Sequence, residues 1–249
     1  MSPPIVFYDI PSTLPNKSWS PNTLKTKYAL NFKNIPFKIV WVEYPDIERV
    51  SKEIGAPPTS NKPDGRPHYT LPMIHDPSTG AVISDSSNIA AYLDATYPDT
   101  PRLLPEGTFG LFRAFEAAAS ALLTPVYPWA LPASHSFLNP PSQDYFRSTR
   151  EKSLGKTLEA LVPTGEEGAA AWANFKAGFG KMDEWVRASG TGATYFMDKT
   201  PSYADIWIAG YVLWLKLVLP DKWEDMKTWH DGRWATLLRN MEKYEGVPE

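Results

Sequence analysis

Residues 69–85 read YTLPMIHDPSTGAVISD, and this stretch predicts two short antiparallel strands joined by a tight turn. Two apolar runs flank the sequence Pro-Ser-Thr-Gly, which is the usual pattern of a β-hairpin. Pro72 interrupts the first run and cannot donate a hydrogen bond to a neighbouring strand, so we expect the chain to kink there; a proline at such a kink often follows a cis peptide bond. The backbone N–H and C=O of Leu71 would then be free to pair with another molecule.

The chain before this hairpin predicts a strand, a helix and a second strand. Residues 5–10 (IVFYDI) and 37–44 (FKIVWVEY) are apolar runs of strand length, and four apolar residues between 24 and 35 recur at helical spacing. Short connections between these segments make a βαβ unit, in which the two strands run parallel. A short helix over 46–55, a polar stretch rich in proline and glycine, the hairpin and a helix over 86–97 give the order β-α-β-α-β-β-α.

The second half of the chain predicts only helices. A proline-rich linker, PDTPRLLPEG, occupies residues 98–107 and separates a domain over 1–97 from an all-helical domain over 108–249. We expect helical segments over 110–131, where three prolines interrupt the helix, over 143–162, over 166–188 and over 202–219. The last of these is apolar almost all round, as in a central buried helix, and Ser202 and Asp205 predict a capping box at its start.

The composition argues against several classes of function. The formal net charge of −3 and the pI of about 5.9 provide no basic field that would attract nucleic acid. Cysteine is absent, which removes disulfides, thiolate metal sites and a protein-thiol nucleophile, and the four histidines lack metal-ligand spacing. Because no apolar run has the length of a signal peptide or a membrane span, we expect a cytoplasmic protein without metal, membrane or nucleic-acid partners.

The first helix begins in the sequence SWSPN at residues 18–22. Ser20 occupies the N-cap position and Pro21 the first helical position, where its missing N–H costs nothing. One interpretation is that Ser20 caps the helix. The other is that its hydroxyl, together with the partial positive charge of the helix N-terminus, stabilises an anion.

Four short motifs follow one another in the order and at the spacing of a known family: Ser20-Pro21, Leu71-Pro72, DSSNI at 85–89 and SYADI at 202–206. With them the chain resembles the soluble glutathione transferases over nearly its whole length, and it is most similar to the fungal-specific class A transferases, which resemble bacterial lignin β-etherases. The resemblance implies a glutathione transferase fold, in which a thioredoxin-like α/β domain (βαβαββα) is followed by an all-α domain. It also implies a homodimer.

The resemblance implies that the catalytic residue is Ser20, with Ser18 as the reserve. The thiolate of glutathione is the nucleophile, and a free thiol titrates near pH 8.5. A serine hydroxyl cannot plausibly remove the thiol proton, so its role would be to donate a hydrogen bond to the sulfur anion. An enzyme of this kind is a serine-type glutathione S-transferase.

The resemblance also assigns the residues that bind glutathione, the co-substrate. Leu71, before the expected cis Pro72, would pair its backbone with the cysteinyl part, as an added strand does. Asp85 and Ser86, at the start of the helix over 86–97, would bind the γ-glutamyl ammonium and carboxylate. Many relatives carry a lysine just before the Leu-Pro step to hold the glycyl carboxylate, and this chain does not. The candidates for that role are Lys52, Arg66 and His68.

Four aromatic residues are candidates for a pocket that takes the second substrate or a ligand: Trp19, Tyr127, Trp129 and Phe137. The expected function is attack of the glutathione thiolate on a hydrophobic or aromatic electrophile, by conjugation, peroxide reduction or aryl-ether cleavage, as in detoxification. The absence of cysteine argues against thiol-transferase chemistry, which needs a protein thiol. The alternative is a ligandin, which binds aromatic or polyphenol molecules with little or no turnover.

Overall fold

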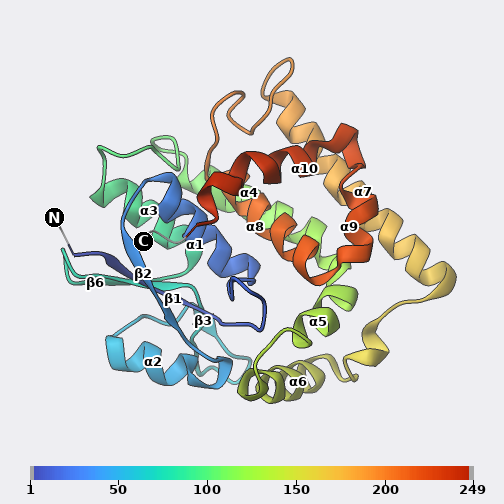
Figure 1. The fold of residues 1–249 in the computed structure, drawn as a ribbon, viewed down its shortest axis with the longest axis horizontal. Helices are drawn as coiled ribbons and strands as arrows, with labels where there is room; N and C mark the ends of the chain where they lie inside the picture. Colours follow the sequence, from blue (N-terminus) through green and yellow to red (C-terminus); the bar gives the residue numbers. More distant parts are fainter. Residues whose placement is uncertain (1–2, 247–249) are drawn as a thin grey trace.

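The computed structural model describes residues 3–246, and its N-terminal half is built on a four-stranded mixed sheet (Figure 1). The strands lie in the order β2-β1-β5-β6, with β1 parallel to β2 and antiparallel to β5. Their bounds are β1 Ile5–Asp9, β2 Phe37–Trp41, β5 Met73–Asp76 and β6 Ala81–Ser84. All five residues of β1 are buried, as expected for an interior strand with helices on both faces.

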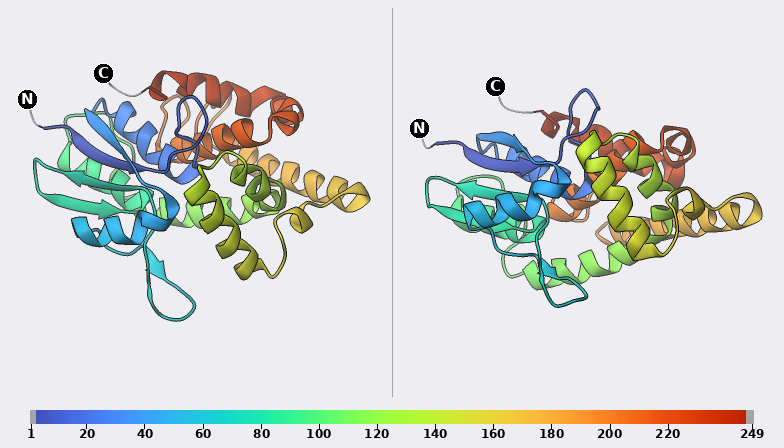
Figure 2. Two further views of the ribbon diagram at one scale, coloured as in Figure 1. Left: turned by 60° about the horizontal axis from the view of Figure 1, so that its bottom comes forward. Right: turned by 90° about the horizontal axis from the view of Figure 1, so that it is seen from below.

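Three helices cover this sheet. Helices α1 (Pro21–Phe32) and α3 (Ser86–Thr96) pack on one face, and α2 (Ile47–Ile54) lies across the other (Figure 2). A 3-10 turn, η1 (Tyr44–Asp46), leads into α2. The predicted thioredoxin-like arrangement is therefore confirmed, including the parallel βαβ unit.

The hairpin predicted over residues 69–85 forms as expected. The Leu71–Pro72 peptide bond is cis, and β5 pairs with β6 around a turn in which Gly80 adopts a φ of 76°. One element was missed: the polar stretch before the hairpin forms a second, two-stranded ribbon of β3 (Ser60–Asn61) and β4 (Pro67–His68), which projects from the sheet (Figure 2).

The segment between the two halves is tied to the first half by one buried carboxylate. Asp94 of α3 accepts a hydrogen bond from Lys33 Nζ at 2.7 Å and from the backbone N–H groups of Leu103 and Leu104. Both side chains of the Lys33–Asp94 pair are almost fully buried. The residues that lead into the helical half are therefore fixed against α1 and α3.

The second half is helical. Its helices are α4 Phe109–Leu123, α5 Tyr127–His135, α6 Pro140–Leu154, α7 Gly165–Ala188, α8 Tyr203–Val218, α9 Pro220–Met226 and α10 Trp229–Met241. Short 3-10 turns occur at η2 Thr124–Val126, η3 Glu159–Leu161 and η4 Glu242–Tyr244. Within residues 3–246, no helix is long and apolar enough to cross a membrane.

Helix α8 is the central helix of this half and lies against α1 (Figure 1). Its residue Gly210 permits the close approach, because a Cβ there would lie 2.9 Å from the carbonyl oxygen of Pro21. At its start, Asp205 accepts hydrogen bonds from the backbone N–H and the hydroxyl of Ser202, both at 2.8 Å, and from the N–H of Phe196. The capping box therefore also fastens the preceding loop.

The predicted helix over 143–162 was wrong beyond Leu154. The helix ends at Leu154, because Gly155 adopts a φ of 68°, the left-handed conformation typical of a glycine after a helix. The chain then turns, and Glu151 accepts a hydrogen bond from the N–H of Leu158. The amphipathic pattern of the sequence continues past Gly155, so the sequence predicted a longer helix than the one that forms.

Candidate functional site

Three cavities meet at the start of α1, and we name them by their linings. The polar cavity, of about 450 Å³, is enclosed by the Leu71–Pro72 step, α3, α4 and α8. The basic cavity, of about 250 Å³, lies between the Leu71 step, η1, β4 and α6. The aromatic cavity, of about 220 Å³, lies between the start of α1, α5, α6 and α8. Asn22 lines all three cavities, Leu71 lines the polar and basic cavities, and Ser20 lines the basic and aromatic cavities.

Ser20 occupies the N-cap position of α1 but its side chain makes no capping hydrogen bond. Its backbone carbonyl accepts the N–H of Leu24 at 2.9 Å, while Pro21 supplies no N–H at the first helical position. The side chain is buried, with 4% of the residue exposed. The hydroxyl is therefore not used to complete the helix and lies at the walls of two cavities.

Ser18 lies on a different side of the same loop. Its hydroxyl donates to Asp9 Oδ2 at 2.8 Å and accepts from Lys27 Nζ at 3.5 Å. Burial raises the pKa of Asp9, although hydrogen bonds from Thr23 and Ser18 lower it. Ser18 lines a fourth cavity, which we call the rear cavity, and is not among the residues described as lining the other three. The structure thus separates the two candidate serines.

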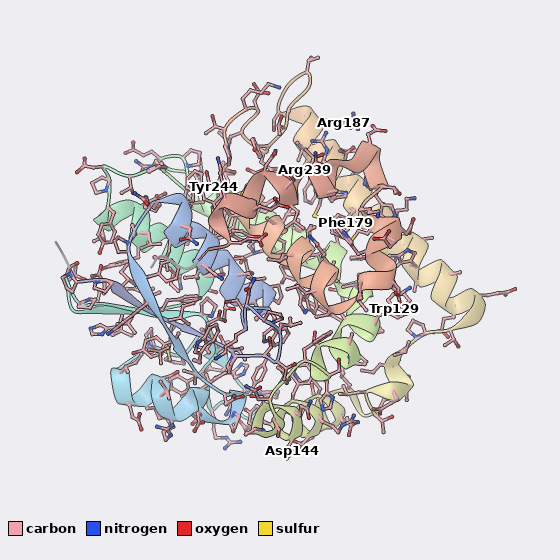
Figure 3. All side chains as sticks on the ribbon, viewed as in Figure 1. Trp129, Asp144, Phe179, Arg187, Arg239 and Tyr244 are labelled. Carbon is pink, nitrogen blue, oxygen red and sulfur yellow. The ribbon has the colours of Figure 1, made fainter. Side chains whose placement is uncertain are left out.

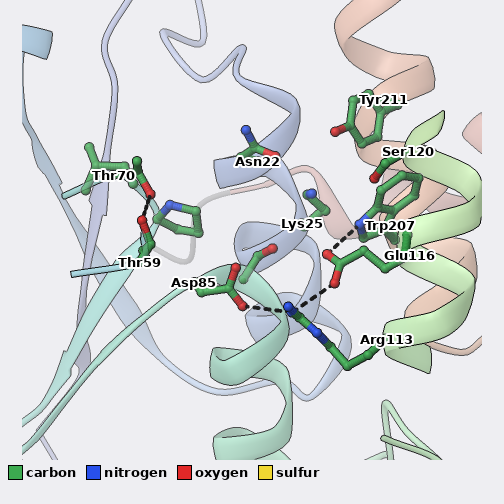
Figure 4. Close-up of a pocket in the computed structure, with 14 residues that line it drawn as sticks. Asn22, Lys25, Thr59, Thr70, Asp85, Arg113, Glu116, Ser120, Trp207 and Tyr211 are labelled. Carbon is green, nitrogen blue, oxygen red and sulfur yellow. Dashed lines mark hydrogen bonds and ion pairs between the residues drawn. The ribbon is translucent and has the colours of Figure 1, made fainter. Parts of the chain in front are cut away.

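In the polar cavity, two carboxylates and an arginine form a connected group (Figure 4). Asp85, with a φ of 76°, caps α3 by accepting the N–H groups of Ser87 and Asn88, both at 3.1 Å. Arg113 of α4 lies 3.5 Å from the Asp85 carboxylate and 2.9 Å from that of Glu116. Glu116 also accepts Trp207 Nε1 at 3.1 Å, which fixes its orientation.

Lys25 of α1 reaches the same cavity from the opposite wall. Only 3% of it is exposed, and its ammonium lies 4.8 Å from the ring centroid of Trp207 and 5.1 Å from that of Tyr211. Burial lowers the pKa of Lys25 to about 8, while Glu116 and Asp85 raise it. The cavity thus holds two cations and two carboxylates, an arrangement suited to a molecule that carries both an ammonium and a carboxylate.

Sequence reasoning placed Asp85 and Ser86 here but missed Lys25, Arg113 and Glu116. Lys25 follows Ser20 by five residues on helix α1, which is buried nearly all round. A lysine on such a helix needs a partner for its charge, and this could have indicated a role in the site. Arg113 and Glu116 lie on α4, and no local pattern in the sequence connects α4 with α3.

The basic cavity contains three side chains able to carry positive charge: Lys62, His68 and Arg150. Lys62 Nζ donates to Glu48 at 3.1 Å, and the guanidinium of Arg150 lies 4.3 Å from the ring of Phe146. Burial lowers the pKa of His68, and Lys62 and Arg150 lower it further. Of the three residues predicted for this role, the structure places His68 in the cavity.

The other two predicted cations lie elsewhere. Lys52 is exposed on α2 and pairs with Glu48 at 2.8 Å, and Arg66 is exposed and pairs with Asp64 at 2.6 Å. Neither is among the residues described as lining the basic cavity. Lys62 and Arg150 were missed because they come from the β3–β4 ribbon and from α6, which the sequence did not connect.

The four aromatic candidates divide into two pairs. Trp19 and Tyr127 line the aromatic cavity, with Trp214 of α8. Trp129 packs edge-on against Trp172 at 5.7 Å, with Lys222 over its ring, and lies beside α9 (Figure 3). Phe137 contributes its carbonyl, which accepts the N–H of Thr13 at 2.8 Å. Trp19 and Tyr127 therefore line the aromatic cavity, whereas Trp129 and Phe137 are not among the residues described as lining it.

Comparisons with known proteins agree on one family. A family model described as "Glutathione S-transferase, N-terminal domain" matches residues 19–96, and one described as "Glutathione S-transferase, C-terminal domain" matches residues 110–244. The "Glutathione S-transferase-like protein ustS" of Aspergillus flavus is 33% identical over 94% of this chain and 88% of that protein.

Two solved fungal structures are similar to the whole chain. The glutathione S-transferase CsGST63524 of Ceriporiopsis subvermispora, in complex with glutathione, is 54% identical with a TM-score of 0.95, over 99% of this chain and all of that one. The glutathione transferase GSTFuA3 of Phanerochaete chrysosporium is 43% identical with a TM-score of 0.93, over the full length of both chains.

Proposed function

Because the chain belongs to the glutathione S-transferase family, we propose that it is a serine-type transferase in which Ser20 holds the glutathione thiolate for attack on an aromatic or hydrophobic electrophile. The observation that carries the proposal is the Ser20 hydroxyl, which stands at a helix N-terminus, makes no capping bond and lines two of the three joined cavities. A related protein was crystallised with glutathione, which supports glutathione as the co-substrate.

The middle of glutathione would bind at Leu71. This residue precedes the cis proline, and within residues 3–246 its backbone N–H and C=O enter no backbone hydrogen bond. An extended peptide can pair with such free groups as an added strand does. Because Leu71 lines both the polar and the basic cavity, the two ends of the tripeptide would lie on either side of it.

The γ-glutamyl end would occupy the polar cavity, whose charges match it. Its ammonium suits the carboxylates of Asp85 and Glu116, and its carboxylate suits Lys25 together with the Ser86 hydroxyl and the N-terminus of α3. The glycyl carboxylate would occupy the basic cavity, near Lys62, His68 and Arg150. Only the γ-glutamyl end carries an ammonium, so the carboxylates of the polar cavity and the cations of the basic cavity would fix the direction in which the tripeptide binds.

The sulfur would then lie at the start of α1. The first turn of a helix presents unpaired N–H groups and partial positive charge, both of which favour the thiolate over the thiol. The Ser20 hydroxyl would donate one further hydrogen bond, and the Asn22 side chain, which lines all three cavities, is the neighbouring donor. Lowering the thiol pKa toward 7 increases the share of glutathione that is nucleophilic.

The electrophile would occupy the aromatic cavity, which opens from the same point. Trp19, Tyr127 and Trp214 provide apolar ring surfaces that suit a flat aromatic acceptor. Conjugation, peroxide reduction and aryl-ether cleavage all begin with the thiolate at this place. The choice among them depends on the acceptor.

The test compares the two serines with one chromogenic aryl halide and one fixed glutathione range. We expect Ser20→Ala to lose most of kcat with little change in the KM for glutathione, and Ser18→Ala to keep kcat, because Ser18 is bonded to Asp9. Equal activity in Ser20→Ala and the parent protein would refute the assignment. Tight binding of aromatic molecules with no turnover in the parent protein would instead support a ligandin.

A further inference from the structure

The rear cavity is a separate chamber behind the loop that carries Ser20. It has a volume of about 270 Å³ and is lined by α1, by α8, by the loop residues Leu14, Pro15, Asn16 and Ser18, and by Tyr244 and Glu245. Drug-sized ligands occupy pockets of about 300–1,000 Å³, so this chamber suits a smaller molecule. Ser18 lines it while Ser20 lines the basic and aromatic cavities, so one short loop separates it from the proposed thiolate site.

Most of the lining is apolar. Leu14, Leu24, Leu213 and Leu217 contribute aliphatic surface from the loop, α1 and α8. The polar groups are few: the Ser18 hydroxyl, the Lys27 ammonium, the Tyr28 hydroxyl, Asn16 and Glu245. An apolar chamber with a small number of placed polar groups is the usual form of a small-molecule site.

Lys27 is the feature that calls for a ligand. It is 4% exposed, and in the described part of the chain its ammonium makes one hydrogen bond, at 3.5 Å to Ser18 Oγ. An ammonium has three N–H donors, and a buried charge is stable only when it is paired or hydrogen-bonded. Burial lowers the pKa of Lys27, while Asp9 and Glu245 raise it. Donor capacity therefore remains unused on the wall of the chamber.

The neighbouring carboxylates define what can approach this ammonium. Asp9 already accepts Ile10 N–H at 2.7 Å and Ser18 Oγ at 2.8 Å, and it is not among the residues that line the chamber. Glu245 does line it, held by the Tyr28 hydroxyl at 3.0 Å. The carboxylate of a ligand can therefore pair with the Lys27 ammonium. A ligand with a second carboxylate would place it near Glu245, where the two negative charges repel each other.

We propose that the rear cavity binds a small amphipathic monocarboxylic acid, with its carboxylate on Lys27 and its apolar body against Leu24, Leu213 and Leu217. This site is distinct from the glutathione site and does not depend on the proposed function. Pro15 and Asn16 line the chamber and are exposed, so part of its wall lies at the molecular surface, and neither residue lines the other three cavities.

Calorimetric titration with octanoate tests the proposal on the full chain saturated with S-hexylglutathione, whose peptide and hexyl groups would fill the polar, basic and aromatic cavities under the proposed function. We expect one octanoate per chain in its presence. Lys27→Met should weaken octanoate binding at least tenfold, Leu217→Trp should abolish it by filling the chamber, and octanedioate should bind more weakly than octanoate. Lys52→Met, on exposed α2, is the matched control and should leave the affinity unchanged.

The proposal is overturned if octanoate does not bind, if S-hexylglutathione displaces it, or if both variants bind it as the parent protein does. Should Lys27→Met fail to fold, Leu217→Trp decides the outcome. If S-hexylglutathione itself does not bind, that result counts against the proposed function. Titrations of octanoate into the free protein and the same variants then decide whether the rear cavity binds a monocarboxylic acid.

Discussion

Replacing Lys25 with methionine is expected to have opposite effects on stability and on glutathione binding. Lys25 is 3% exposed, and its ammonium lies over the rings of Trp207 and Tyr211. Burial lowers its pKa and Arg113 lowers it further, while the carboxylates of the polar cavity raise it. A charged group in such a place costs folding free energy, and a ligand carboxylate recovers it. Methionine keeps the length and the apolar stem but removes the charge.

The size of the effect follows from the pKa of Lys25. Its fall from 10.5 to about 8 corresponds to about 3 kcal/mol of penalty on the charged form in the folded protein. The variant also loses the cation–π contacts with Trp207 and Tyr211, worth about 1 kcal/mol. We therefore expect Lys25→Met to raise the free energy of unfolding by about 1–2 kcal/mol, or the Tm by about 2–8 °C.

The pH dependence has a definite sign. Below pH 8 the lysine is charged in both the folded and the unfolded state, so the penalty is present in full. Between pH 8 and 10.5 the folded protein releases the proton before the unfolded chain does, so the stability of the parent protein rises toward that of the variant. The advantage of Lys25→Met should therefore shrink across this window.

Urea denaturation at pH 7 and pH 10, with calorimetric titration of S-methylglutathione at pH 7, measures both effects. We expect the variant to bind S-methylglutathione about 10- to 100-fold more weakly, because a charged hydrogen bond to the γ-glutamyl carboxylate is lost. Lys52→Met should change neither quantity, because Lys52 is exposed. A Lys25→Met variant that is less stable and binds the ligand normally would refute the reasoning.

Three further predictions concern other parts of the chain. Asp94→Ala should lower the free energy of unfolding by about 3–5 kcal/mol in urea denaturation, because it leaves a buried lysine unpaired. Glu159→Gln removes an exposed ion pair and should leave the free energy of unfolding nearly unchanged, so equal losses in the two variants would contradict this. Asp205→Ala removes the acceptor of the capping box, so it should lower the Tm by several degrees in calorimetry and leave the KM for glutathione unchanged. A raised KM would contradict the purely structural role of Asp205. Arg150→Gln should raise the KM for glutathione about tenfold or more in steady-state assays, whereas Lys52→Gln should leave it unchanged. A raised KM in Lys52→Gln and an unchanged KM in Arg150→Gln would place the glycyl carboxylate outside the basic cavity.

The sequence predicted those parts of the fold that short-range patterns determine. The parallel βαβ unit, the hairpin after Pro72 and the apolar helix α8 each follow from a local period or a turn. The helix ending at Leu154 was extended too far because Gly155 falls inside an otherwise amphipathic pattern, and a glycine stops a helix only if its backbone turns left-handed. The β3–β4 ribbon was missed because two-residue strands have no detectable alternation.

The candidate site was predictable where its residues lie beside a motif. Leu71 and Asp85 adjoin the cis proline and the start of α3, and the structure places both at the polar cavity. Arg113 and Glu116 reach that cavity from another domain, and their placement depends on how α4 packs beside α3, which no local spacing encodes. The surroundings of Trp129 were equally unpredictable, because its neighbours Trp172 and Lys222 come from two other helices.

The central claim is that Ser20 holds the thiolate at the start of α1, and the pKa of enzyme-bound glutathione tests it most directly. Thiolate absorbance in the ultraviolet, measured against pH for the saturated protein, gives this pKa. A lost hydrogen bond to a charged sulfur is worth about 1.5–3 kcal/mol, so Ser20→Ala should raise the pKa by about 1–2 units, while Ser18→Ala leaves it unchanged. An unchanged pKa in Ser20→Ala, or a rise seen only in Ser18→Ala or Asn22→Ala, would contradict the account.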